Sequence, residues 1–128
     1  MNELAKLEKF ARRYAKAWCS RDPEKVAAFY AKSGSISVNG AQCVPIAEVA
    51  RGFMREFPDM TVAFDKLEPR GDQTAFHWTF TGTHAETGNH VRISGYELWK
   101  IDDAGLIAES SGHFDAAEYS DSLEARDK

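Results

Sequence analysis

The sequence predicts one α+β domain in which helices come first and a mainly antiparallel sheet follows. Up to about residue 57, apolar residues recur every three or four positions, and after residue 60 they alternate with polar residues, as in strands. Turn sequences such as Arg70-Gly71-Asp72 separate the alternating segments. The 128 residues are the size of a single domain, and their 43% hydrophobic content supports one core.

Three helices are expected in the first half of the chain. The first begins at Leu4 and stops near Ser20, with Tyr14 and Trp18 on its apolar stripe. The second runs from Pro23 to Ala31, because proline suits the first helical position and the preceding aspartate is a favourable N-cap. The buried side of this second helix is expected to carry Val26, Ala27, Phe29 and Tyr30. The third helix spans residues 46–57 and is followed by a proline.

The strands are predicted from alternation and from the β-branched and aromatic residues within it. They cover residues 35–39, 60–65, 73–86, 90–101 and 106–115. The last three are long and joined by tight turns, which predicts an antiparallel meander. Gly82, Gly95 and Gly112 each interrupt one of these long strands, where glycine marks a bend or a close approach. We therefore expect a sheet that curls strongly around the helices.

Composition excludes several classes of partner and cofactor. The net charge of −4 provides no electrostatic surface for nucleic acid, and no apolar run is long enough for a membrane helix. The opening residues MNELAKLEKF contain no apolar signal segment, which predicts a cytoplasmic protein. The histidines form no metal-binding motif, and no phosphate-binding glycine loop is present. We expect neither a metal nor an organic cofactor.

Three stretches together resemble a known superfamily: AWCSRDPEKVAAFYAKSGSISVNG, WTFTGTH and ELWKIDDAGLIAESSGHFD. They are similar to the NTF2-like superfamily, most of all to its SnoaL-like polyketide cyclase branch and to ketosteroid isomerase. The resemblance covers residues 4–119. It implies a cone of three N-terminal helices packed in a strongly curved, mostly antiparallel sheet around an apolar cavity. The domain is expected to occupy residues 1–119, followed by a polar tail over residues 120–128.

Strand parity, combined with this resemblance, predicts which side chains face the cavity. Alternate residues of two strands are assigned to the inward face. They are Trp78, Phe80, Gly82 and His84 on one strand and Ile93, Gly95, Glu97 and Trp99 on the next. The expected cavity-lining residues are Trp18, Tyr30, Val38, Met54, Trp78, Phe80, Gly95, Trp99, Ser110, Gly112 and Phe114. For each aromatic residue in this set, ordinary core packing is the alternative.

Glu97 is the most informative residue, because a carboxyl group on a buried strand face is unusual. In the ketosteroid isomerase pattern this position holds a protonated acid, and Tyr14 matches the tyrosine beside it; that isomerase is a standard example of a carboxylic acid kept neutral by an apolar site. The resemblance implies that both donate hydrogen bonds to a substrate oxygen. The alternatives are a structural buried pair or a Glu97 that reaches solvent. The isomerase base would align with Val38, and a supporting tyrosine with Met54, so steroid isomerisation is not expected.

Two further residues are candidates for acid or base chemistry. His84 is inward by parity and could exchange protons at neutral pH, although a rim histidine bonded to a loop is the alternative. Asp115 matches the acidic residue near the end of the last strand in SnoaL-like cyclases, but strand parity turns it outward.

Three functions remain open at this point. The first is proton transfer, in a cyclisation, isomerisation or dehydration, on a small hydrophobic substrate that contains a carbonyl group. The second is non-catalytic binding of a small apolar molecule in the cavity, and the third is a dimerisation module. Tyr96 and Leu98 form an apolar patch on the outer sheet face, through which family members commonly pair. A homodimer is therefore expected.

Overall fold

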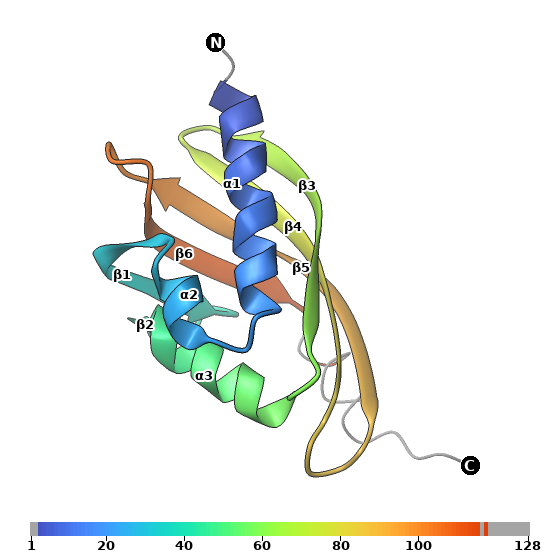
Figure 1. The fold of residues 1–128 in the computed structure, drawn as a ribbon. Helices are drawn as coiled ribbons and strands as arrows, with labels where there is room; N and C mark the ends of the chain where they lie inside the picture. The colour runs from blue at the N-terminus through green and yellow to red at the C-terminus, as the bar shows by residue number, and fades with distance from the viewer. Residues whose placement is uncertain (1–2, 116, 118–128) are drawn as a thin grey trace.

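A computed structural model describes residues 3–115 and 117 of the chain, and the tail predicted over residues 120–128 lies outside the described residues. Within this part, helices and strands follow one another in an α+β order (Figure 1). The elements are α1 (Glu3–Trp18), α2 (Pro23–Ala27), β1 (Tyr30–Val38), β2 (Val44–Pro45), α3 (Ile46–Glu56), β3 (Thr61–Arg70), β4 (Gln73–Thr83), β5 (His90–Ile101) and β6 (Ile107–Phe114). The predicted fold class is confirmed.

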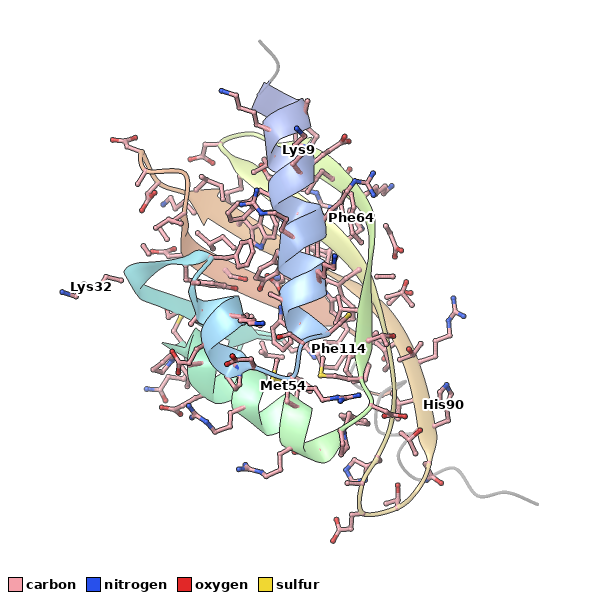
Figure 2. All side chains as sticks on the ribbon, in the orientation of Figure 1. Lys9, Lys32, Met54, Phe64, His90 and Phe114 are labelled. Atoms are coloured by element: carbon pink, nitrogen blue, oxygen red, sulfur yellow. The ribbon has the colours of Figure 1, made fainter. Side chains whose placement is uncertain are left out.

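The strands form one curved, open sheet with the order β2-β1-β6-β5-β4-β3. β3, β4, β5 and β6 are antiparallel neighbours, as a meander requires, whereas β1 joins β6 in parallel. All three helices lie on the same, concave side of the sheet, and α1 crosses it diagonally (Figure 1). Side chains from the helices and from this face occupy much of the space between them, and charged ones such as Lys32 extend from the periphery (Figure 2).

The second helix is shorter than predicted, because it ends at Ala27 rather than at Ala31. The Phe29 carbonyl accepts a hydrogen bond of 3.0 Å from the Ile107 amide, and Tyr30 pairs with Ile107 as the first residue of β1. Pairing with β6 therefore places the residues from Tyr30 onward in a strand, although their helical periodicity predicts that the helix continues. Because β6 lies about 77 positions away along the chain, local sequence carries no sign of it.

A group of stacked aromatic rings forms the centre of the core, between α1 and the middle of the sheet. Trp99 is fully buried and stacks on Phe76, with ring centroids 4.9 Å apart and planes 13° from parallel. Tyr14 from α1 contacts both rings edge-on, at 5.2 and 5.3 Å. These three residues fix α1 against β4 and β5 and so determine where polar groups beside them can lie.

None of the helices within residues 3–115 is both long and apolar enough to cross a membrane.

Candidate functional site

A cavity of about 80 Å³ lies on the concave face, between the sheet and helices α1 and α3. Its wall includes seven of the residues selected from the sequence: Trp18, Val38, Trp78, Phe80, Glu97, Gly112 and Phe114. It also includes residues that were not selected: Ile36, Val49, Phe53, Met60, Val62, Phe76 and Ile93. Periodicity had marked several of these as apolar, but apolar character alone does not separate a cavity wall from solid core.

The remaining residues predicted to line the cavity lie behind its wall. Tyr30, Trp99 and Ser110 are buried around the Glu97 carboxyl group, and Met54 is buried on α3. Gly95 is covered by the indole of Trp78, whose ring carbons would lie 2.7 and 2.9 Å from a Cβ at that position. We therefore exclude these five from the cavity-facing set.

Glu97 is the one titratable side chain among the described residues that line the cavity. Its position on β5 pairs with Phe76 on β4 and with Gly112 on β6. The side chain is directed toward the helices, and only 6% of the residue is exposed. The inward parity predicted for Glu97 thus agrees with its burial.

The two oxygens of Glu97 have different surroundings. Oε1 accepts hydrogen bonds from the Trp99 indole N–H at 2.8 Å, from the Tyr14 hydroxyl at 3.0 Å and from the Ser110 hydroxyl at 3.0 Å. Tyr30 lies further away, at 3.5 Å from Oε1, and its hydroxyl is 2.9 Å from that of Tyr14. For Oε2, the described residues include a single donor, Tyr14 at 3.2 Å.

Burial raises the pKa of Glu97 above its ordinary value, and the hydrogen bonds from Trp99, Tyr14, Ser110 and Tyr30 act in the opposite direction. Removal from water disfavours the anion, whereas donors aimed at the carboxyl group favour it. The pKa of Tyr14 is raised well above 10, first by burial and then by the nearby Glu97 charge. Tyr14 therefore keeps its proton and acts as a donor to Glu97.

The structure places Tyr14 beside Glu97 but outside the cavity wall. It is completely buried and is absent from the cavity wall, because its hydroxyl lies behind the Glu97 carboxyl group. A molecule in the cavity would meet Glu97 and not Tyr14. Tyr14 is thus a positioning residue, since it orients the carboxyl group without reaching a ligand.

The family model of the SnoaL-like domain matches residues 11–110, which is most of the chain. The chain belongs to the SnoaL-like domain family. A sequence comparison with curated proteins found no match.

Solved structures share the fold of this SnoaL-like domain at low sequence identity. AclR from Streptomyces galilaeus, a candidate hydroxylase, has a TM-score of 0.80 and 18% identity, covering 94% of this chain and 97% of its own. A candidate SnoaL-like polyketide cyclase from Jannaschia sp. CCS1 has a TM-score of 0.76 and 18% identity over 94% and 92% of the two chains. A protein of ketosteroid isomerase-like fold from Catenulispora acidiphila, in complex with trimethylamine, has a TM-score of 0.80 and 11% identity over 92% and 94%.

His84 lies outside the cavity wall of this SnoaL-like domain. Its ring packs against Phe57, with centroids 5.2 Å apart, and its Nδ1 accepts a hydrogen bond from the Thr87 amide. Nε2 therefore carries the proton in the neutral ring, and it lies 3.6 Å from a carboxylate oxygen of Glu56. These contacts correspond to the alternative of a rim histidine bonded to a loop.

Asp115 directly follows β6, is exposed, and is also absent from the cavity wall. Among the described residues of the SnoaL-like domain, no group of three or more His, Cys, Asp or Glu is placed to hold a metal ion. Of the four predicted catalytic residues, the fold brings Tyr14 and Glu97 together and leaves His84 and Asp115 elsewhere.

Proposed function

We propose that this domain transfers a proton to a small, mostly apolar carbonyl compound, with Glu97 as the general acid. The supporting observation is a carboxyl group on the wall of an otherwise apolar cavity, where burial raises its pKa. A carboxylic acid that stays protonated near neutral pH can give its proton to a substrate oxygen. Cyclisation, isomerisation and dehydration of carbonyl compounds all begin with such a transfer or with the enol that it forms.

Water is the second participant in the proposed step and accepts the proton that the substrate loses. The proton passes from Oε2 of Glu97 to the carbonyl oxygen, while water removes a proton from the adjacent carbon to give the enol. The hydronium ion formed returns a proton to Glu97. Water takes this part because the described cavity wall includes no second titratable side chain, and Val38 occupies the position of the isomerase base.

The cavity volume limits the proposed substrate. Its size of about 80 Å³ is well below the roughly 300–1,000 Å³ of pockets that hold drug-sized ligands. A steroid or a fused-ring polyketide would require the wall to open. We therefore infer a substrate of a few carbon atoms or a single small ring.

Hydrogen–deuterium exchange provides a test that needs no knowledge of the natural substrate. Cyclopentanone in D₂O exchanges its α-hydrogens through the enol, and loss of their ¹H NMR signal measures the rate. We expect the protein to accelerate this exchange over buffer, and more strongly at pH 6 than at pH 9. An exchange rate equal to that of buffer over this pH range would reject the proposal.

Non-catalytic binding is the second candidate function, and one observation favours it. A single titratable group in the described wall can bind a ligand without converting it. The related fold from Catenulispora acidiphila was solved with trimethylamine, a small molecule of suitable size. Ligand binding without any acceleration of exchange would support this alternative.

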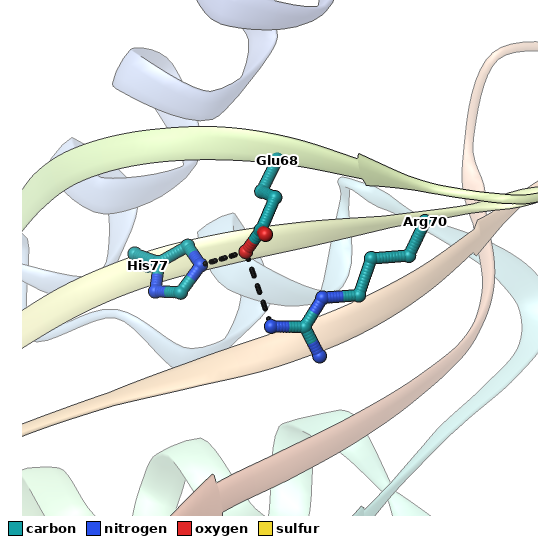
Figure 3. A network of polar contacts seen from close by, with 3 residues as sticks. All are labelled: Glu68, Arg70 and His77. Atoms are coloured by element: carbon teal, nitrogen blue, oxygen red, sulfur yellow. Dashed lines mark hydrogen bonds and ion pairs between the residues drawn. The ribbon is translucent and has the colours of Figure 1, made fainter.

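We also propose that the domain forms a homodimer through the outer face of the sheet. On this face Glu68 accepts hydrogen bonds from His77 at 2.9 Å and from Arg70 at 3.1 Å (Figure 3). The Arg70 guanidinium lies over the ring of Tyr96, 4.8 Å from its centroid, and Tyr96 stacks on His113 at 4.9 Å. These contacts hold a group of aromatic rings in place, which is a suitable surface for a second copy.

Light scattering after gel filtration tests the dimer. We expect a mass twice the 14.3 kDa of one chain, and Tyr96→Glu should convert the dimer into monomers by placing a charge in the interface. Lys16→Glu reverses an exposed charge on α1, away from this face, and should leave the mass unchanged. A wild-type mass of one chain would refute the dimer.

A further inference from the structure

The shape of the cavity follows from two glycines in successive cross-strand rows of the sheet. In one row, β4, β5 and β6 contribute Phe76, Glu97 and Gly112, which pair in register. The next row is made of Trp78, Gly95 and Phe114. Because a glycine leaves its place in each row without a side chain, a neighbouring group or a ligand can occupy that place.

The position over Gly112 has room for a methyl group. A Cβ at this position would meet only ordinary contacts, at 3.8 Å from the Ser37 carbonyl oxygen and at 3.9 Å from Glu97 Cγ and Ile36 Cδ1. Gly112 and Glu97 both belong to the cavity wall. A ligand atom over Gly112 would therefore lie directly beside the Glu97 side chain.

The space over Gly95 is filled, in contrast, by the indole of Trp78. A Cβ at Gly95 would lie 2.7 and 2.9 Å from two indole carbons and would also meet the His113 carbonyl oxygen. Trp78 is half-buried and meets Phe114 edge-on at 6.2 Å, and both rings belong to the cavity wall. The indole thus closes the cavity over the second row.

Glu97 has one oxygen left for a ligand. Oε1 already accepts three hydrogen bonds of 3.0 Å or less, whereas the single described donor to Oε2 is Tyr14 at 3.2 Å. The described cavity wall includes no lysine, arginine or histidine, so it offers no positive charge to an anionic ligand. The wall can therefore accommodate one polar atom, and that atom must lie beside Oε2.

We propose that the ligand is a small neutral molecule held through a single oxygen atom over Gly112, beside Oε2 of Glu97, and that Trp78 sets its upper size limit. This inference rests on the proposed function, since it concerns the same cavity. It adds the ligand's charge, the number of its polar contacts, its place on the sheet and the residue that limits its size.

A ligand series titrated into ¹⁵N-labelled protein at pH 6 tests these points. The probes are cyclopentanone, pyrrolidinium, cyclopentanecarboxylate and 2-adamantanone, which vary charge and size around one ring. We expect cyclopentanone to shift the Gly112 amide and Trp78 indole resonances, and the other three to leave both unshifted. Stronger binding of pyrrolidinium than of cyclopentanone would mean that Glu97 is ionised and selects cations. Tight binding of cyclopentanecarboxylate would mean that the cavity takes anions. Either result would refute the neutral ligand.

Glycine substitutions test the position of the ligand. Gly112→Ala adds a methyl group at the proposed ligand position, so cyclopentanone binding should weaken at least about tenfold, the scale on which pockets discriminate one methyl group. Gly52→Ala is the matched control, because a Cβ on Gly52 in α3 meets nothing within 4 Å. Unchanged binding by Gly112→Ala would overturn the proposed position.

Trp78 variants test the size limit. We expect Trp78→Ala to bind 2-adamantanone, with Trp78→Phe intermediate, because a smaller side chain vacates the part of the space over Gly95 that the indole occupies. Circular dichroism should show that both variants fold. Binding of 2-adamantanone by the wild type, or by neither variant, would reject Trp78 as the limit. Binding of cyclopentanone without hydrogen exchange would reject the proposed catalysis while leaving this inference intact.

Discussion

Glu97→Gln is expected to reduce protein-catalysed exchange of cyclopentanone by about 10²–10⁴-fold, the usual contribution of a general acid. An amide cannot give up a proton, whereas its N–H can still donate a hydrogen bond from the position of Oε2. Its carbonyl oxygen can take the place of Oε1 and accept from Trp99, Tyr14 and Ser110. The variant should therefore fold and bind cyclopentanone but fail to exchange its hydrogens.

The pH dependence provides an independent check of this assignment. An acid acts only in its protonated form, so wild-type exchange should decline as the pH rises through the pKa of Glu97, which burial raises. The residual rate of Glu97→Gln should follow that of buffer and show no such decline. Exchange by Glu97→Gln at the wild-type rate would exclude Glu97 as the acid.

Trp99→Ala is expected to cause the largest loss of stability, about 3–5 kcal/mol, as is usual for truncating a large buried aromatic residue. Trp99 is fully buried, stacks on Phe76, contacts Phe10 and Tyr14 edge-on, and donates a hydrogen bond of 2.8 Å to Glu97. Domains of this kind are stable by about 5–15 kcal/mol, so the variant should be close to unfolding. Urea unfolding followed by far-ultraviolet circular dichroism measures the loss.

Two matched variants separate the contributions of Trp99. Trp99→Phe retains a ring beside Phe76 but removes the indole N–H, and we expect it to cost about 1–3 kcal/mol, the penalty for a buried hydrogen bond left unmade. Trp78→Ala removes the same type of residue from the same sheet face, where it is half-buried, and should cost less than Trp99→Ala. If Trp99→Ala cost less than Trp78→Ala, Trp99 would not be at the centre of the core.

The fold prediction succeeded where apolar residues recur at a regular spacing along the sequence. The amphipathic stripe of α1 and the alternation in β4 and β5 appear in the sequence because each element has one face against the core. The prediction failed where a distant partner competes with local preference, as at Tyr30, which pairs with Ile107 instead of extending α2. β2 was missed because two residues are too few to show any period.

The candidate site was only partly predictable. Parity on β5 placed Glu97 on one strand face with Gly95 and Trp99, because successive strand residues point to opposite faces. The resemblance to ketosteroid isomerase turned that face inward, in agreement with the burial of Glu97. The donors Trp99 and Ser110 could not be assigned in this way, since their contacts with Oε1 depend on side-chain direction and on the register of β6. His84 had the predicted parity but lies beyond the end of β4, where the hairpin turns it toward Glu56 and Phe57.

The sequence by itself determined the α+β class, the order of most elements and which residues of each long strand share a face, including the face that carries Glu97. These properties depend on period and composition, which neighbouring residues along the chain carry. Tertiary structure alone decided that the Tyr14 hydroxyl donates to Glu97, that the Glu97 side chain belongs to the cavity wall, and that a Cβ fits over Gly112 whereas the Trp78 indole takes part of the space over Gly95. These properties depend on distances of a few ångströms between segments far apart in the chain, and packing fixes such distances only when the whole core assembles.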